Sequence, residues 1–208
     1  CAGRTDTGVH ALGQVVHFDT QAQRSERNWL LGTNVNLPQD VSVTWARPVS
    51  DEFSARFSAV SRRYRYFILN RTSRSAVLAG RVTWTHRPLD ATRMQEAARA
   101  LVGEHDFSSY RALGCQAKSP VKTMDEISFE QLPYPGGTEL RAHLRARSFL
   151  HNQVRSFVGT LERVGAGACT PDDVTAALVA CDRAACGPVS PPQGLYLAAV
   201  RYPVDPFG

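Results

Sequence analysis

The first ten residues, CAGRTDTGVH, place an arginine and an aspartate two positions apart between two glycines. In an extended backbone, residues two apart point to the same side, so Arg4 and Asp6 would share a face. Gly3 and Gly8 let the chain turn tightly and let a ligand come close to the backbone. A carboxylate on such a loop can act as a nucleophile or bind a ligand. Taken alone, the stretch is more typical of an Asx turn or a surface ion pair.

A second group of residues that could do chemistry lies in the stretch SRRYRYFIL, around Tyr64 and Tyr66. Arginines flank both tyrosines, and aromatic rings interleaved with arginines suit nucleobase stacking combined with phosphate contacts. The alternative is an ordinary strand with buried tyrosines, in which Arg62, Arg63 and Arg65 are solvated. The local pattern slightly favours this alternative.

A third residue, Arg155, lies in FLHNQVRSFVGTLERVG, whose apolar residues recur at helical spacing. At the edge of an apolar stripe, an arginine usually extends to solvent. It can instead reach a buried carboxylate and hold it in the charged form. The sequence leaves both possibilities open.

The sequence offers little support for a metal or a cofactor. The six histidines show no HExxH-type spacing, and there is no cluster of carboxylates. There is also no GxGxxG motif, no Walker A loop and no GxSxG motif. We therefore expect chemistry without a metal or a cofactor.

The composition is that of a soluble globular protein, with 208 residues, 43% hydrophobic and 21% charged. An apolar run of about 18 residues and a signal-peptide pattern are both missing, so we expect neither a membrane span nor secretion. The five cysteines form an odd set without regular spacing, which favours free thiols in a reducing cytoplasm. The chain starts with Cys1 instead of Met, which suggests a fragment of a longer protein.

The net charge is +5 and the isoelectric point about 9.2, and every basic residue except Lys118 and Lys122 is an arginine. Arginine binds phosphates through its forked side chain and stacks on bases, which favours a polyanionic partner. A GC-rich genome, which enriches arginine codons, would explain the same composition.

The sequence predicts both strands and helices, and these elements must position the residues described above. Alternation or apolar content predicts strands over 13–19, 41–49, 61–69, 124–130, 139–147 and 194–203. Helical spacing and capping residues predict helices over 25–37, 91–102, 151–164 and from Thr170 onward. A strict βαβ alternation is missing, so we expect an α+β fold in which helices pack on a mixed, largely antiparallel sheet.

Loop-rich sequence at 70–90 predicts a division into an N-terminal half, 1–85, which carries the opening loop, and a C-terminal half, 86–208. In the predicted strand ELRAHLRAR, apolar residues alternate with basic ones. Its basic face, over 141–147, would then point outward and join the arginines around Tyr64 as candidates for phosphate contacts.

Several of these stretches, in this order and spacing, resemble the tRNA pseudouridine synthase A family. They are GRTDTGVHA, GQVVHF, NLP (36–38), ARFSA and RRYRY (55–66), FLHNQVRSFVG (149–159) and the closing GLYL. The resemblance covers essentially all 208 residues. It implies isomerisation of uridine to pseudouridine in the tRNA anticodon stem-loop, at positions 38 to 40, by a cytoplasmic homodimer without cofactor or metal. It also implies the pseudouridine synthase fold, two similar halves with the active cleft between them.

Carried over position by position, the resemblance makes Asp6 the catalytic aspartate and Tyr64 the tyrosine that contacts the substrate. Arg4 would help to hold the flipped-out nucleotide, and Arg155 would pair with the aspartate. The chain departs from the family at Thr7, where alanine is usual, and in the segment before the GRTD loop, which supplies a first strand and helix in the family.

The chemistry of the reaction leaves three roles open for Asp6: attack on C1′, attack on C6 of the uracil, or removal of a proton from the ribose. The target uridine must leave the base stack in every case. The alternatives are a tRNA-binding module without catalysis and a truncated, inactive synthase. Which uridines are modified and how the dimer is arranged do not follow from the sequence.

Overall fold

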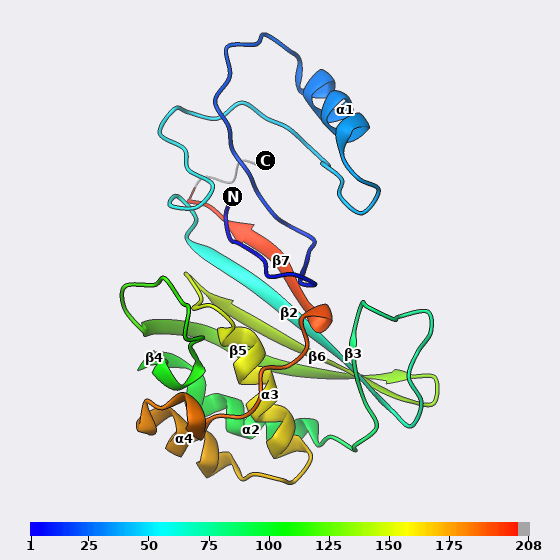
Figure 1. Cartoon of the computed structure of the whole chain (residues 1–208), viewed down its shortest axis with the longest axis vertical. Coiled ribbons are helices and arrows are strands. Elements are labelled where there is room, and N and C mark those ends of the chain that lie inside the picture. Colours follow the sequence, from blue (N-terminus) through cyan, green and yellow to red (C-terminus); the bar gives the residue numbers. More distant parts are fainter. Residues whose placement is uncertain (204–208) are drawn as a thin grey trace.

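The computed structural model describes residues 1–203, and Figure 1 shows their arrangement. The strands are β1 (His10–Ala11), β2 (Ser61–Arg71), β3 (Thr83–Thr85), β4 (Gly103–Asp106), β5 (Val121–Tyr134), β6 (Gly137–Ala146) and β7 (Leu195–Arg201). The α-helices are α1 (Glu26–Asn36), α2 (Ala91–Ala98), α3 (Gln153–Gly165) and α4 (Pro171–Ala180). The predicted α+β class is confirmed.

One seven-stranded sheet runs through this part of the chain, in the order β1-β7-β2-β6-β5-β4, and β3 pairs with the end of β2 beyond β7. The pairs β1–β7 and β2–β3 are parallel, and all the other pairs are antiparallel. The sheet is therefore mixed and largely antiparallel, as predicted.

Strand β2 lies inside the sheet, between β7 and β6, and its alternate side chains are buried. Tyr64, Tyr66 and Ile68 are buried, and they lie opposite Leu144, Ala142 and Leu140 of β6. The alternation holds from Arg62 to Ile68 in β2 and from Leu140 to Ala146 in β6, whereas Leu69 is buried next to Ile68. Tyr64 consequently stands on a strand that is paired on both sides.

Helices α2, α3 and α4 gather on one side of the sheet (Figure 1). Asp90 caps α2 by accepting hydrogen bonds from the amides of Thr92 and Arg93. Thr170 caps α4 in a complete capping box with Asp173, as its sequence predicts. The buried side chains of α3, including Phe157, Val158 and Leu161, join the sheet in one hydrophobic core. Helix α3 is thereby held rigidly, which matters because Arg155 projects from it.

Two predicted strands, 13–19 and 41–49, do not form in the structure. A strand is stable only beside another strand, and neither segment is paired with a strand in the described residues. Val15 accepts one hydrogen bond from the amide of Ala2, at 2.8 Å, while Val16 and Phe18 are more than half exposed. Val43 pairs with the side-chain amide of Asn34 instead of a strand, through two hydrogen bonds of 2.8 Å.

Helix α1 forms where the sequence predicts it, but it has no buried residues and stands away from the sheet (Figure 1). Cys181 ends α4 in a left-handed conformation and is exposed. Within residues 1–203, none of the helices combines the length and the apolar character needed to cross a bilayer.

Candidate active site

The opening loop is anchored at several points before it reaches Asp6. The side-chain amide of Gln14 donates to the carbonyl oxygen of Gly3 at 2.6 Å, and the amide of Ala2 donates to Val15. The amide of Val9 then donates to the carbonyl oxygen of Asp6 at 3.0 Å, which closes a tight turn. Gly8 has a φ of +82° in this turn, a conformation that side chains with a Cβ rarely adopt. The loop therefore presents the aspartate from a defined turn.

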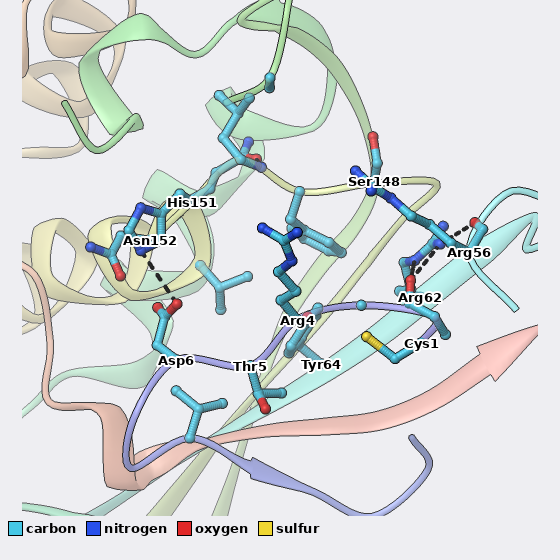
Figure 2. A pocket seen from close by; sticks show the side chains of 18 of the residues that line it. Cys1, Arg4, Thr5, Asp6, Arg56, Arg62, Tyr64, Ser148, His151 and Asn152 are labelled. Atoms are coloured by element: carbon cyan, nitrogen blue, oxygen red, sulfur yellow. Dashed lines mark hydrogen bonds and ion pairs between the residues drawn. The ribbon is translucent and has the colours of Figure 1, made fainter. Parts of the chain in front are cut away.

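A cleft of about 980 Å³ lies over this loop. Arg4, Asp6, Tyr64 and Arg155, the four residues singled out from the sequence, all line it. Figure 2 shows Asp6 and His151 at one end, Arg56 and Arg62 at the other, and Arg4 and Tyr64 between them. Segments far apart in the sequence thus meet around one concave site.

The carboxylate of Asp6 has a positively charged or polar partner on each of its two oxygens. Nη1 of Arg155 lies 3.6 Å from Oδ2, and Nε2 of His151 lies 3.3 Å from Oδ1. Arg155 is held in turn, because its Nε donates to the carbonyl oxygen of Ser190 at 2.7 Å and its Nη1 donates to Oδ1 of Asn152 at 2.9 Å. Its side chain is only 15% exposed. Arg155 therefore reaches the carboxylate and does not extend to solvent.

Arg4 points into the cleft on the same side as Asp6, as the two-residue spacing predicts (Figure 2). Its Nη1 lies 3.4 Å from Oε1 of Gln116, the one side-chain hydrogen bond it makes in the described residues. Asp6 pairs with Arg155 and His151 instead of Arg4. The described residues therefore do not form the local ion pair that the opening stretch suggests on its own. The charge of Arg4 remains available to a ligand in the cleft.

Tyr64 is 9% exposed and contributes part of the cleft floor. Phe149 packs edge-on against its ring, with a centroid separation of 5.0 Å. Burial raises the pKa of Tyr64 to about 12, and the nearby charge of Asp6 adds to this effect while Arg62 opposes it. The phenol is therefore neutral in the physiological range. It can contact a base or share a hydrogen bond, but it cannot act as a free base.

Arg62 is not available for phosphate contacts, which corrects one prediction from the sequence. The side chain is buried, and burial lowers the pKa of its guanidinium. It donates to the carbonyl oxygens of Ala2, Arg56 and Arg147, at distances of 2.6 to 3.1 Å. Arg62 thereby ties the opening loop to two other segments that border the cleft.

The outward face of β6, which was predicted to contact phosphates, is paired with glutamates in the structure. Arg141 lies within 4 Å of both Glu139 and Glu130, and Arg145 lies 3.3 Å from Glu126. His143 faces Glu130 as well, at 3.6 Å. Arg141 and Arg145 are thus neutralised by glutamates of β5 and β6, so their contribution to binding a polyanion is reduced.

His151 and Phe149 were not identified as site residues from the sequence. Both lie in the stretch FLHNQVRSFVG, directly before α3. The available signal in the sequence was the pair of polar residues, His151 and Asn152, next to the start of that helix. The amide of His151 also donates to Sγ of Cys115, at 3.4 Å. Burial raises the pKa of this thiol, but hydrogen bonds from Ala117, His151 and Arg111 outweigh burial and lower it overall.

The cleft has a strongly positive lining. Among the described residues, its charged side chains are five arginines and a single carboxylate, that of Asp6. The arginines are Arg4, Arg56, Arg62, Arg147 and Arg155. Residues 1–203 contain no group of three histidine, cysteine, aspartate or glutamate side chains placed to share a metal ion. The arrangement suits a carboxylate-dependent reaction on a negatively charged, base-containing substrate.

Comparison with known proteins agrees with this chemistry. Residues 97–203 match the family described as tRNA pseudouridine synthase. The chain is 58% identical over 207 residues to the tRNA pseudouridine synthase A of Cereibacter sphaeroides strain KD131, covering 99% of this chain and 81% of that protein. It is 56% identical to that of Dinoroseobacter shibae, covering 99% and 80%, and 53% identical to that of Pseudomonas aeruginosa, covering 98% and 70%.

Proposed function

Because the chain belongs to the tRNA pseudouridine synthase A family, we propose that it isomerises uridine to pseudouridine in tRNA, at positions 38 to 40 of the anticodon stem-loop, with Asp6 as the acting carboxylate. One observation carries this proposal. Asp6 is the only carboxylate among the charged groups that the described residues place in the cleft, and both of its oxygens have partners.

The reaction exchanges one bond for another within the same nucleoside. The bond from C1′ to N1 breaks, the uracil turns and C1′ joins C5. The proton on C5 is then released, and N1 takes up a proton from solvent. Asp6 starts this sequence by attacking C1′ or C6 or by removing a ribose proton, and all three routes need a carboxylate oxygen aimed at the nucleoside. Arg155 and His151 support this requirement because they restrict the carboxylate to one orientation.

Tyr64 and Arg4 supply substrate contacts in this proposal. The uridine must leave the stack before its C1′, C5 and C6 become accessible. Tyr64, whose phenol stays protonated, packs on the extruded base and offers its hydroxyl for hydrogen bonding. Arg4, whose charge is unpaired in the described residues, holds the flipped nucleotide through its phosphate.

The two predicted halves contribute in complementary ways. Segment 1–85 supplies Arg4, Asp6 and Tyr64, and segment 86–208 supplies His151 and Arg155, so we place the active cleft between them. The family resemblance supports a homodimer, and a tRNA substrate supports a cytoplasmic location. Thr7 follows Asp6 directly, and it does not line the cleft. We therefore expect activity to tolerate it.

The test is tritium release from tRNA labelled at C5 of uridine. We expect the chain to release tritium and the Asp6→Asn variant to bind the same tRNA without release. Wild-type release from that variant would remove Asp6 from the mechanism. Binding without release by the unaltered chain would instead indicate a tRNA-binding module or an inactive synthase.

A further inference from the structure

The end of the cleft opposite Asp6 has its own set of ligand-type residues, which the reaction at the uridine does not use. Phe57 lines the cleft and is 77% exposed, although it is a large apolar ring. The guanidinium of Arg56 lies 5.3 Å from the centre of that ring. Arg147 lines the same cleft and is also exposed. An exposed aromatic ring beside two arginines is the combination that binds unpaired nucleotides.

This end of the cleft is organised by buried contacts. Arg62 donates one hydrogen bond to the carbonyl oxygen of Arg56 and another to that of Arg147, both at 2.6 Å, and two more to Ala2. The amide of Phe57 donates to Oγ of Ser54 at 3.2 Å, which fixes the turn that presents the ring. The backbone positions of the aromatic ring and both arginines are thus tied to the loop that carries Asp6.

The charges at this end are also unneutralised. Across residues 1–203, neither Arg56 nor Arg147 forms an ion pair with a carboxylate, whereas Arg141 and Arg145 on the sheet face do. The cleft volume of about 980 Å³ is at the upper end of the range that holds one drug-sized ligand. There is accordingly space for a nucleotide in addition to the reacting uridine.

We propose that Arg56, Phe57 and Arg147 form a subsite for the nucleotide next to the reacting uridine. The ligand is an unpaired nucleotide joined to the uridine by a phosphodiester. Its base stacks on Phe57, and the backbone phosphate is bound by Arg56 and Arg147. The subsite rests on the proposed function, because it needs an RNA strand in the cleft. It explains why Arg56 and Arg147 have no carboxylate partner within the described residues.

The stacking contact is tested with tRNA binding in the Asp6→Asn background, which prevents turnover during titration. Three versions of one tRNA are compared: intact, abasic on the 5′ side of the target uridine, and abasic on the 3′ side. On intact tRNA, Phe57→Ala should weaken binding by about 5- to 100-fold. On one of the two abasic tRNAs, the same substitution should change binding less than about 2-fold, because the stacking partner is already missing.

Matched variants separate stacking from simple apolar packing. Phe57→Trp should restore binding, and Phe57→Leu should bind as weakly as Phe57→Ala, because leucine has no aromatic face. Phe18→Ala is the control, since Phe18 is also exposed but does not line the cleft. Equal losses on all three tRNAs, or full binding by Phe57→Leu, would overturn the stacking role. Melting curves identify any variant that misfolds.

The phosphate contacts are tested through salt dependence. Arg56→Ala and Arg147→Ala should each reduce the slope of log K against log salt concentration by about 0.7. Arg99→Ala, at an exposed position outside the cleft, should leave the slope unchanged. Unchanged slopes for both cleft variants would overturn this part. If the chain forms pseudouridine but Phe57→Ala weakens intact and abasic tRNA equally, only the subsite proposal is wrong. If Phe57→Ala affects intact tRNA more than one abasic tRNA but no pseudouridine forms, only the proposed function is wrong.

Discussion

Two regions of this molecule are rich in arginine, and they differ in what surrounds the charges. On the outward face of β6, Arg141 stands directly opposite Glu130 of β5, and Arg145 is directly opposite Glu126. In the cleft, Arg4, Arg56 and Arg147 are on loops, where no strand lies alongside to supply an acid. A regular sheet thus brings partners to its charges, whereas loop arginines keep theirs free for a ligand.

This difference shows why the charge of a sequence is a poor map of its binding surface. Both regions contain several arginines, and the face over 141–147 was predicted to contact phosphates. The register between β5 and β6 places a glutamate opposite Arg141 and another opposite Arg145, so the arginines of the sheet face are neutralised. The cleft, with its single carboxylate, is therefore the region that we expect to act on RNA.

The largest effect should come from removing that single carboxylate. Asp6→Asn keeps the size of the side chain but cannot act as a nucleophile or a base. We expect turnover in the tritium-release assay to fall by about 10³-fold or more, while tRNA binding stays within about 3-fold. A parallel loss of turnover and affinity would show that Asp6 serves binding instead.

The next prediction compares the stability lost on removing Arg62, which is buried in the cleft wall, with that lost on removing Arg141, which is ion-paired on the sheet face. Arg62→Ala would leave the carbonyl oxygens of Ala2, Arg56 and Arg147 without their donor. We expect it to lower the free energy of unfolding by on the order of 3 kcal/mol in urea titrations. Arg141→Ala should cost less than about 1 kcal/mol, because its ion pairs are partly exposed. Equal losses would mean that Arg62 has no special organising role.

Arg155→Ala tests whether a cation in the cleft can serve the protein's own carboxylate instead of the RNA. Without Arg155, Oδ2 of Asp6 loses its partner while Oδ1 keeps His151. We expect the single-turnover rate constant to fall by about 10²-fold, with little change in the affinity for tRNA. A pure loss of affinity would assign Arg155 to substrate binding.

Glu162 tests a buried carboxyl group outside the cleft lining, which shares Ser190 as a hydrogen-bond partner with Arg155. Burial raises its pKa to about 7, although Oγ of Ser190 donates to it at 3.2 Å. A raised pKa in the folded state means that the neutral form is favoured, so stability is lost as the pH rises from 4.5 to about 7. Glu162→Gln should remove this loss and be more stable at pH 8 by on the order of 2 kcal/mol. Parallel stability curves for both proteins would contradict this account.

The smallest effect should follow from making the sheet face resemble the cleft. Glu130→Gln would leave His143 without a carboxylate and remove one of the two carboxylates near Arg141. We expect tRNA affinity at low salt to rise by about 2-fold, with no change in turnover, because only non-specific attraction increases. A larger gain, or any change in turnover, would show that the sheet face takes part in productive binding.

Much of the fold could be predicted because local patterns determine it. The alternation of β2 and β6, the caps of α2 and α4 and the apolar stripe of α3 are each encoded within about a dozen neighbouring residues. The predicted strands at 13–19 and 41–49 failed because their pattern was local but their pairing was not. Among the site residues, the resemblance placed Arg4, Asp6, Tyr64 and Arg155, and the structure brings them to one cleft. No local pattern singled out His151 or Phe57.

The sequence alone therefore determined the kinds of elements, the residue types available for chemistry and the family resemblance. Tertiary structure decided which charge meets which. It placed Arg155 and His151 on the two oxygens of Asp6, buried Arg62 among backbone carbonyls and paired Arg141 with glutamates. The physical reason is range: helix caps and strand alternation depend on neighbours in the chain, whereas an ion pair forms within 4 Å in space and needs no nearness in sequence.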